Sequence, residues 1–208
     1  MPTPLEPRLL LAAVTSILIA SGIDPVADRY TWFLETLPVM IGIPLLLATG
    51  RRFPLTTLLY RLLALHALIL IVGGHYTYAE VPLFDWLRDT LSLSRNHYDR
   101  VGHLAQGFIP AILAREILLR CSPLQRGGWL FLTVTSICLA FSAFYELIEW
   151  WIALLSGQAA TAFLGTQGDP WDTQWDMFLA LVGAITAQLT LGRVHDRQLR
   201  PLLQNGSI

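Results

Sequence analysis

The stretch from Arg95 to His103, which reads R-N-H-Y-D-R-V-G-H, holds the residues of this chain most suited to chemistry. It ends a polar loop and opens an apolar helix, so Asp99 and His103 lie on one helical face as the chain enters the membrane. A carboxylate and an imidazole that point the same way can bind a metal ion or transfer a proton. Ionisable groups at that depth are costly unless they are paired or used, which makes this stretch a functional-site hypothesis.

Two later segments repeat the pattern. Glu146 and Glu149 are three residues apart in F-S-A-F-Y-E-L-I-E-W-W, and Asp172 and Asp176 open the last apolar segment. Two carboxylates so close in a low-dielectric environment repel each other unless one is protonated or a cation lies between them. Small residues follow Asp176 at helical spacing and allow a neighbouring helix to approach, so we expect Asp176 to face the bundle.

The composition indicates a polytopic helical membrane protein. Hydrophobic residues make up 54% of the 208 residues and the mean hydropathy is +0.52, which leaves little room for a soluble domain. The net charge is −1, so a nucleic-acid partner is not expected. We expect both Cys121 and Cys138 to be structural, because they lie far apart in the sequence.

The expected architecture is an all-α bundle of six transmembrane helices in a single integral membrane domain, residues 1–208. Apolar runs place the spans at about 9–23, 30–48, 56–74, 100–119, 129–155 and 171–192. The segment between the third and fourth spans carries apolar residues on one side and charges on the other. This pattern predicts a short helix around residues 83–89 that lies in the membrane interface.

The distribution of arginine predicts the orientation. Ten arginines fall on the side of the two termini and four on the opposite side. By the positive-inside rule, both termini should be cytoplasmic, in the inner membrane of a bacterium. The six spans then bring the strongest polar candidates into the outer half of the membrane. These candidates are Glu35, His75, Asp99, His103, Glu146, Glu149, Asp172 and Asp176.

Other polar residues have simpler explanations. Asp169 precedes a proline and is expected to cap the last helix, and the helix dipole could satisfy Asp172. His66 is alone in the middle of a span, which is typical of a core histidine. We expect His195 to be a solvated residue of the C-terminal tail.

Four motifs carry a resemblance to a known family. They are H-Y-T-Y-A-E-V-P at 75–82, N-H-Y-D-R-V-G-H at 96–103, Y-E-L-I-E-W-W at 145–151 and F-L-G-T-Q-G-D-P-W-D-T-Q-W-D-M at 163–177. Together they resemble the YjdF-like family of bacterial inner-membrane proteins, whose function is undefined. The resemblance implies six spans and an inner-membrane location. The order D-x-x-x-H, then E, then D on three helices is more remotely similar to VanZ-like membrane proteins, which implies cell-envelope chemistry.

The same residues support different functions. In the favoured one, a divalent ion such as zinc, manganese or iron binds to metal ligands, with further residues acting as catalytic groups. The ligands would be His75, Asp99, His103, Glu149 and Asp176, and the catalytic residues Glu146, Glu149 and Asp172. The protein would then be a membrane-embedded hydrolase or transferase whose partners are the bilayer and a lipid-linked or amphiphilic small molecule.

The alternatives are a small proton- or cation-coupled transporter and a non-catalytic scaffold held by a buried polar network. Against the transporter, the sequence places no acidic group of this kind in the inner half of the membrane, and no broken-helix pair is visible.

Overall fold

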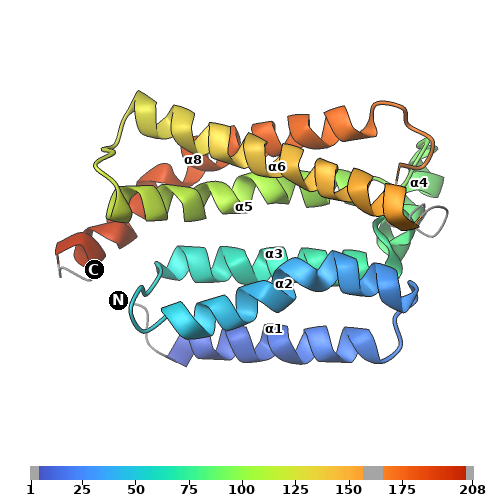
Figure 1. Cartoon of the computed structure of the whole chain (residues 1–208), viewed down its shortest axis with the longest axis horizontal. Helices are drawn as coiled ribbons and strands as arrows, with labels where there is room; N and C mark the ends of the chain where they lie inside the picture. Colours follow the sequence, from blue (N-terminus) through green and yellow to red (C-terminus); the bar gives the residue numbers. More distant parts are fainter. Residues whose placement is uncertain (1–4, 157–165, 205–208) are drawn as a thin grey trace.

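The computed structural model describes residues 5–156 and 166–204, and within these ranges the chain forms helices joined by turns and short connections, with no strand. The helices are α1 (Leu5–Ile23), α2 (Arg29–Thr49), α3 (Thr57–Tyr76), the 3-10 turn η1 (Tyr78–Glu80), α4 (Pro82–Leu91), α5 (Tyr98–Cys121), α6 (Gly128–Ser156) and α8 (Asp172–Gln204). The long helices run along one axis, and both chain ends lie at the same end of the bundle (Figure 1).

Each of the six predicted spans corresponds to a long helix. In the described part of the chain, five of these are long and apolar enough to cross a membrane: α1, α2, α3, α6 and α8. Helix α5 is not among them because its polar residues, including Arg115 and Glu116, make it less apolar than the other five. Those side chains are buried against neighbouring helices, as polar groups inside membrane proteins usually are.

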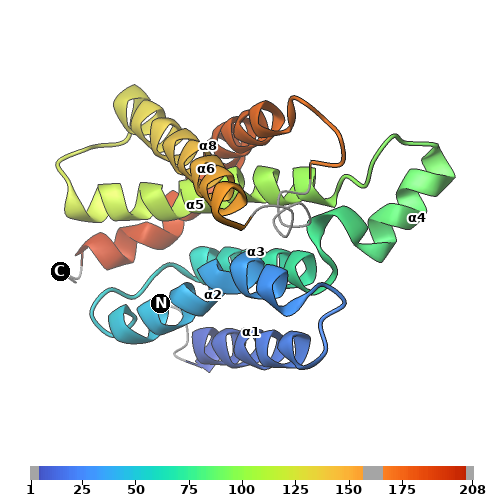
Figure 2. The ribbon, with the colours of Figure 1, turned by 45° about the vertical axis from the view of Figure 1, so that its right-hand side comes forward.

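The helices form two groups of three. Helices α1, α2 and α3 pack on one another, and so do α5, α6 and α8, while α3 packs on α5 and joins the groups (Figures 1 and 2). Helix α5 is therefore the central element, in contact with α3, α6 and α8.

Glycines allow α5 and α8 to pack closely. A Cβ atom built on Gly107 of α5 would lie 1.8 Å from the carbonyl oxygen of Ala180, and one on Gly183 would lie 2.2 Å from that of Leu104. No side chain fits at either position. The predicted small-residue face of the last helix is confirmed, and it sets the distance between the two helices that carry the candidate site.

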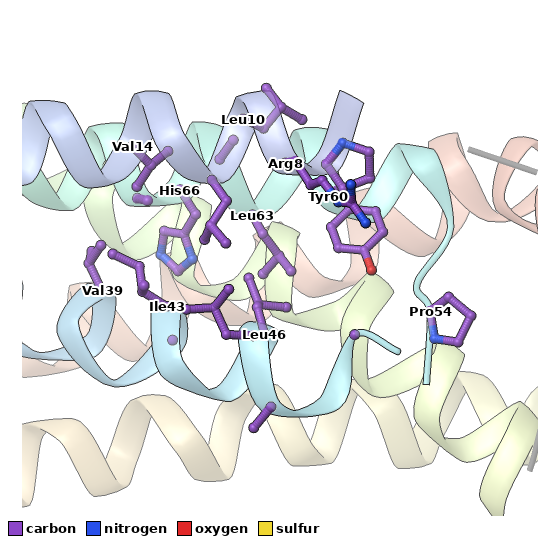
Figure 3. Close-up of a pocket in the computed structure, with 18 of the residues that line it drawn as sticks. Arg8, Leu10, Val14, Val39, Ile43, Leu46, Pro54, Tyr60, Leu63 and His66 are labelled. Atoms are coloured by element: carbon purple, nitrogen blue, oxygen red, sulfur yellow. The ribbon is translucent and has the colours of Figure 1, made fainter. Parts of the chain in front are cut away.

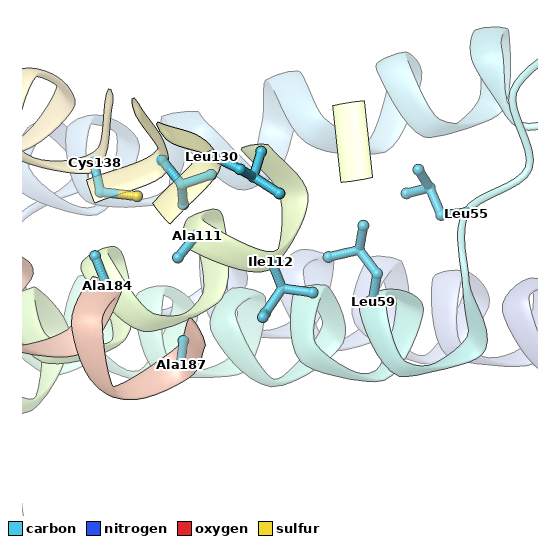
Figure 4. Packing of buried hydrophobic residues seen from close by; sticks show 9 residues of the cluster. Leu55, Leu59, Ala111, Ile112, Leu130, Cys138, Ala184 and Ala187 are labelled. Atoms are coloured by element: carbon cyan, nitrogen blue, oxygen red, sulfur yellow. The ribbon is translucent and has the colours of Figure 1, made fainter. Parts of the chain in front are cut away.

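An apolar core fills the part of the bundle nearer the chain termini (Figure 4). Leu59 of α3, Ile112 of α5, Val134 of α6 and Ala184 of α8 contribute to it, and all four are fully buried. Cys138 is buried in the same core, and both cysteines are free.

The predicted short helix after the third span is present as α4. Its side chains of Leu83, Trp86 and Leu91 are each 61% exposed. Figure 2 shows α4 projecting away from the bundle at the end opposite the termini. This exposed apolar face suits a membrane interface, where we still expect α4 to lie.

Helix α2 begins at a well-formed cap. The carboxylate of Asp28 accepts hydrogen bonds from the amides of Tyr30 and Thr31, at 2.9 and 3.0 Å, and from the Thr31 hydroxyl at 2.6 Å. The hydrogen bond from the Thr31 side chain is the main cause that lowers the pKa of Asp28. This cap fixes the start of the helix that carries Glu35.

Candidate metal centre

Asp99, His103 and Asp176 meet where α5 and α8 begin. The Nε2 atom of His103 lies 3.4 Å from an oxygen of Asp99, one turn earlier on α5, and 3.8 Å from an oxygen of Asp176 on α8. One possible ligand atom from each of the three residues lies within 4.8 Å of the others. All three side chains are buried, with Asp176 only 3% exposed. The two aspartates therefore face the same ring nitrogen.

Glu146 of α6 faces the other nitrogen of the imidazole. Its Oε1 atom lies 3.9 Å from His103 Nδ1. Neither of these atoms, nor Oδ1 of Asp176, has a hydrogen-bond partner among the described residues. Ser142, one turn before Glu146, also has a buried hydroxyl without such a partner. Buried polar atoms are normally paired, so this cluster has unused capacity to bind a proton, a water molecule or a cation.

Two further acids extend the cluster. Glu35 of α2 is buried and interacts electrostatically with Asp99 and His103. Glu149 of α6 is only partly buried, and it interacts with Glu146, Glu35 and Asp99. Five carboxyl groups thus surround one imidazole. In a low-dielectric environment this excess of negative charge requires bound protons or a bound cation.

Two arginines lie beside the cluster and form ion pairs with Asp169 and Asp172, and one of them, Arg95, also pairs with Asp99 of the cluster. Arg95 forms a close ion pair with Asp172 and lies 3.5 Å from Asp99 and 3.6 Å from Asp169. Arg100 lies 2.8 Å from Asp169 and 3.5 Å from Asp172. The structure therefore places Asp172, a predicted catalytic residue, between two guanidinium groups, where it joins the starts of α5 and α8.

The same arginines also affect the pKa of two groups that lie just outside the helices. Burial, and then the charges of Arg95 and Arg100, lower the pKa of His97, so this imidazole is neutral at neutral pH. The hydrogen bond from the Trp171 amide, followed by the pairing with Arg100, lowers the pKa of Asp169. That hydrogen bond measures 2.9 Å and lies in the turn just before α8, which begins at Asp172, so the predicted capping of the helix by Asp169 stays a prediction.

Asn96 and Gln167 hold the two polar loops together. The Asn96 amide donates to the Gln167 side chain, and the Gln167 side chain donates to the Asn96 carbonyl, both at 2.9 Å. The Asn96 side chain also donates to the carbonyl of Val81 at 3.1 Å. Residues from three of the four motifs noted in the sequence therefore meet beside the cluster. Residues 163–165 of the last motif lie outside the described part of the chain.

His75, a predicted metal ligand, has a different partner. Its Nδ1 atom lies 3.0 Å from the carbonyl oxygen of Ser21, at the end of α1, and its ring packs edge-on against Tyr76. It is not one of the three residues whose ligand atoms converge. The structure thus gives His75 a role in joining α1 to α3.

The prediction that His195 is a solvated tail residue is wrong. Helix α8 continues to Gln204, and His195 is fully buried. Arg115 donates a hydrogen bond to Nδ1 of His195 at 2.8 Å, so Nε2 carries the hydrogen and donates to Glu116 at 3.0 Å. The signal was present in the sequence, because His195, Leu199 and Leu202 continue the buried face of α8 at helical spacing.

Glu116 is the centre of this second network, at the end of the bundle that carries the termini. Besides His195, its carboxylate accepts hydrogen bonds from the Thr56 hydroxyl at 2.8 Å and from Arg120 at 3.0 Å. Every polar group named here has a partner. In this respect the network differs from the cluster at His103. We call the network around Glu116 the latch, because it connects α3, α5 and α8.

Comparisons with known proteins agree with a membrane location. Residues 6–197 match a family model described as "Predicted membrane protein (DUF2238)". The chain is 53% identical over 203 residues to the "Inner membrane protein YjdF" of Escherichia coli (strain K12), which covers 96% of this chain and 97% of that protein. No solved structure is significantly similar.

Proposed function

The chain belongs to the DUF2238 family of predicted membrane proteins, and we propose that this multi-pass inner-membrane protein binds a divalent metal ion through Asp99, His103 and Asp176. The observation that carries the proposal is the convergence of ligand atoms from these three residues within 4.8 Å. They come from two helices whose separation is fixed by glycine contacts.

The spacing suits a small divalent ion. Two ligand atoms each about 2.0–2.2 Å from a zinc ion, at a tetrahedral angle, lie about 3.3–3.6 Å apart. The separations from His103 Nε2 are 3.4 Å to Asp99, within this range, and 3.8 Å to Asp176, slightly beyond it. One imidazole and two carboxylates are ligands that zinc, manganese and iron all accept.

Glu146 serves this site as a positioning residue. With Nε2 of His103 turned toward the two aspartates, Nδ1 faces Oε1 of Glu146 at 3.9 Å, and a shift of less than about 1 Å would bring the two atoms within hydrogen-bond distance. A carboxylate on the far side of a ligating histidine orients the ring and raises its basicity. This role differs from the catalytic one predicted for Glu146 from the sequence.

Glu149 is the best candidate for proton transfer. It is the only one of the five acids that is partly exposed in the described structure, so it can reach a substrate that the buried ligands cannot. A bound divalent ion would polarise an ester or phosphoryl oxygen and lower the pKa of a water molecule. Glu149 would accept that water's proton and return it to the leaving group.

The proposed reaction is hydrolysis or group transfer on a lipid-linked or amphiphilic cell-envelope molecule. Its support is the depth of the cluster in a helical membrane protein and the partial exposure of Glu149. The remote likeness to VanZ-like proteins agrees with this substrate class, since its D-x-x-x-H, E and D residues are those that meet at His103.

Elemental analysis of purified protein, loaded with zinc, manganese or iron and then desalted, tests the proposal. We expect about one ion per chain in the wild type and less than a tenth of that in His103→Ala and Asp176→Asn. His75→Ala should retain the ion, because its ring is bonded to Ser21. A wild type that retains no ion, together with a loss of thermal stability in His103→Ala and Asp176→Asn, would reject the metal site and leave the scaffold interpretation.

The transporter alternative draws on one observation. Contrary to the sequence-based expectation, buried ionisable groups do occur at the other end of α5 and α8, at Glu116 and His195. Thirteen residues of α5 separate His103 from Glu116, about 20 Å at 1.5 Å per residue. The apolar core lies between His103 and Glu116, and it includes Ala111 and Ala184, which are both fully buried. This barrier supports a metal site over a proton relay along α5 and α8.

A further inference from the structure

A cavity of about 1130 Å³ lies between α1, α2 and α3, toward the end of the bundle that carries the termini (Figure 3). None of its lining residues belongs to the cluster at His103. The cavity is therefore a separate feature that the proposed metal site does not use.

The cavity exists because α2 lacks bulk where it faces α1 and α3. Pro38 and Pro44 lie inside α2 and interrupt its backbone hydrogen bonds. Gly42 between them has no side chain, and a Cβ atom built there would meet no atom within 4 Å. The remaining walls are mostly apolar, with Val14 of α1 and Ile43 of α2 among them, although His66 of α3 also lines the cavity.

The cavity is long enough for a lipid chain. Its lining residues on α3 extend from Tyr60 to Leu70. These positions span about 15 Å at 1.5 Å per residue, which equals half of a hydrocarbon core about 30 Å thick. One acyl chain of a single membrane leaflet thus matches this length.

Three arginines line the cavity at the end nearer the chain termini. Arg8 comes from α1, and Arg51 and Arg52 come from the connection between α2 and α3; all three are exposed. Figure 3 shows Arg8 and Tyr60 toward one end of the cavity and Val14, Val39 and His66 toward the other. The site is thus amphiphilic, with positive charge at one end and apolar walls at the other.

The acid nearest to these arginines in the sequence does not cancel their charge. Glu6 is paired with Arg61, whose Nε atom lies 2.6 Å from the carboxylate. The excess positive charge suits a phosphate, for which arginine offers several hydrogen-bond donors. Basic pockets between transmembrane helices on the cytoplasmic side bind anionic lipid headgroups, and the arginine distribution predicts that this end is cytoplasmic.

We propose that this cavity binds one anionic phospholipid. Its phosphate would lie against Arg8, Arg51 and Arg52, and one acyl chain would fill the space left by Gly42. Bound lipid would complete the packing between α1, α2 and α3. A phospholipid fits better than free phosphate, because the apolar part of the cavity would otherwise have no occupant.

Native mass spectrometry of delipidated protein in a neutral detergent tests this proposal. Phosphatidylglycerol should bind one molecule per chain, at least about tenfold more tightly than phosphatidylcholine, because of the arginines. Glycerol phosphate, which has the headgroup and no chains, should not bind measurably at the same concentrations. If it binds as tightly as phosphatidylglycerol, the site takes phosphate and the lipid proposal fails.

Two pairs of variants separate headgroup from chain binding. The double variant Arg51→Gln, Arg52→Gln should weaken phosphatidylglycerol binding about tenfold. Arg193→Gln, Arg200→Gln removes the same charge from exposed positions outside the cavity and should have no effect.

Gly42→Phe should abolish lipid binding by filling the cavity, while Gly128→Phe, at an exposed position with no atom near its Cβ, should not. Unchanged binding in Gly42→Phe, or equal binding of the two phospholipids, would overturn the proposal. His103→Ala should bind phosphatidylglycerol normally, so failure of the metal site would leave this result unaffected.

Discussion

The imidazole of His195 lies 3.0 Å from the carboxylate of Glu116, and both side chains are fully buried near the end of the bundle that carries the termini. Arg115 donates to the other ring nitrogen, and the amide of Leu58 donates to Gln198 on the next turn of α8. These contacts connect α3, α5 and α8 at one end. At the opposite end α5 and α8 carry the candidate metal centre, so the latch helps to set the register of the helices that form it.

Breaking this pair should destabilise the protein strongly. Glu116→Ala removes the carboxylate that His195 donates to and one of the acceptors of Arg120, and removing one partner of a buried pair costs about 3–5 kcal/mol. Thermal unfolding in detergent should show a large drop in melting temperature. Glu80→Ala removes an exposed acid and should leave the melting temperature nearly unchanged. Equal decreases in melting temperature in the two variants would contradict the structural role of the latch.

A methyl group at the α5–α8 contact should also destabilise the protein. In Gly183→Ala the new Cβ would lie 2.2 Å from the Leu104 carbonyl oxygen and 2.7 Å from the Phe108 nitrogen, both backbone atoms that cannot turn away. Overpacking of this kind costs about 1–3 kcal/mol.

Gly192→Ala, on the same helix with no atom within 4 Å, is the matched control and should be neutral or slightly stabilising. Melting temperatures that fall equally in both variants would show that glycine is not required at position 183. Gly183→Ala should also reduce metal retention, because it moves Asp176 away from His103.

Replacing Arg95 should lower the free energy of unfolding far more than replacing Arg88. Arg95→Gln removes a buried guanidinium from Asp172 and Asp99 and leaves two carboxylates to repel each other. We expect a loss of about 3–5 kcal/mol in unfolding free energy. Arg88 pairs with Asp85 and Asp89 at the surface, so Arg88→Gln should cost about 0–1 kcal/mol. Chemical denaturation in detergent would compare them, and similar midpoints would refute the difference.

The contribution of the α2 cap to the stability of the fold should depend on pH. The pKa of Asp28 is lowered in the folded protein, chiefly by the Thr31 hydrogen bond. Its carboxylate therefore stabilises the fold above the unfolded value of about 3.9, and this contribution is lost as the pH falls through the lowered value. Asp28→Ala should cost about 1 kcal/mol at pH 7 and less at pH 3.

Melting temperatures of the wild type and Asp28→Ala at both pH values measure this effect. Asp24→Ala, which removes an exposed acid from the same connection, is the control. A difference between wild type and Asp28→Ala that grows on acidification would show that the sign is wrong.

Reporter fusions should determine the orientation and the number of spans. Fusions after Gly50 and Gln125 should report cytoplasm, and one at Thr90 should report the outside, because ten of fourteen arginines lie on the side of the termini. A fusion at Gly165, which lies outside the described residues, should also report the outside. Thr90 and Gln125 flank α5, so the same location for both would mean that α5 does not cross the membrane.

The sequence by itself determined the class of protein and the positions of its long helices. Apolar runs of bilayer length predict helices directly, because every backbone polar group in lipid must be bonded within its own segment. Spacing along a helix also predicted local pairs such as Asp99 with His103, and the glycine face that includes Gly183. These features depend on local geometry, so no knowledge of packing was needed.

Only the tertiary structure decided which polar groups share a partner. The sequence made Glu149 a metal ligand and Glu146 a catalytic residue only, but the rotation of α6 turns Glu146 toward His103 and leaves Glu149 partly exposed, outside the three residues whose ligand atoms converge. Asp172 and Asp176 are also one turn apart, yet Arg95 contacts the first and His103 the second. Such choices depend on the rotation and separation of whole helices, which contacts distant in the sequence set. The latch between Glu116 and His195 was missed for the same reason, since its two residues are 79 positions apart.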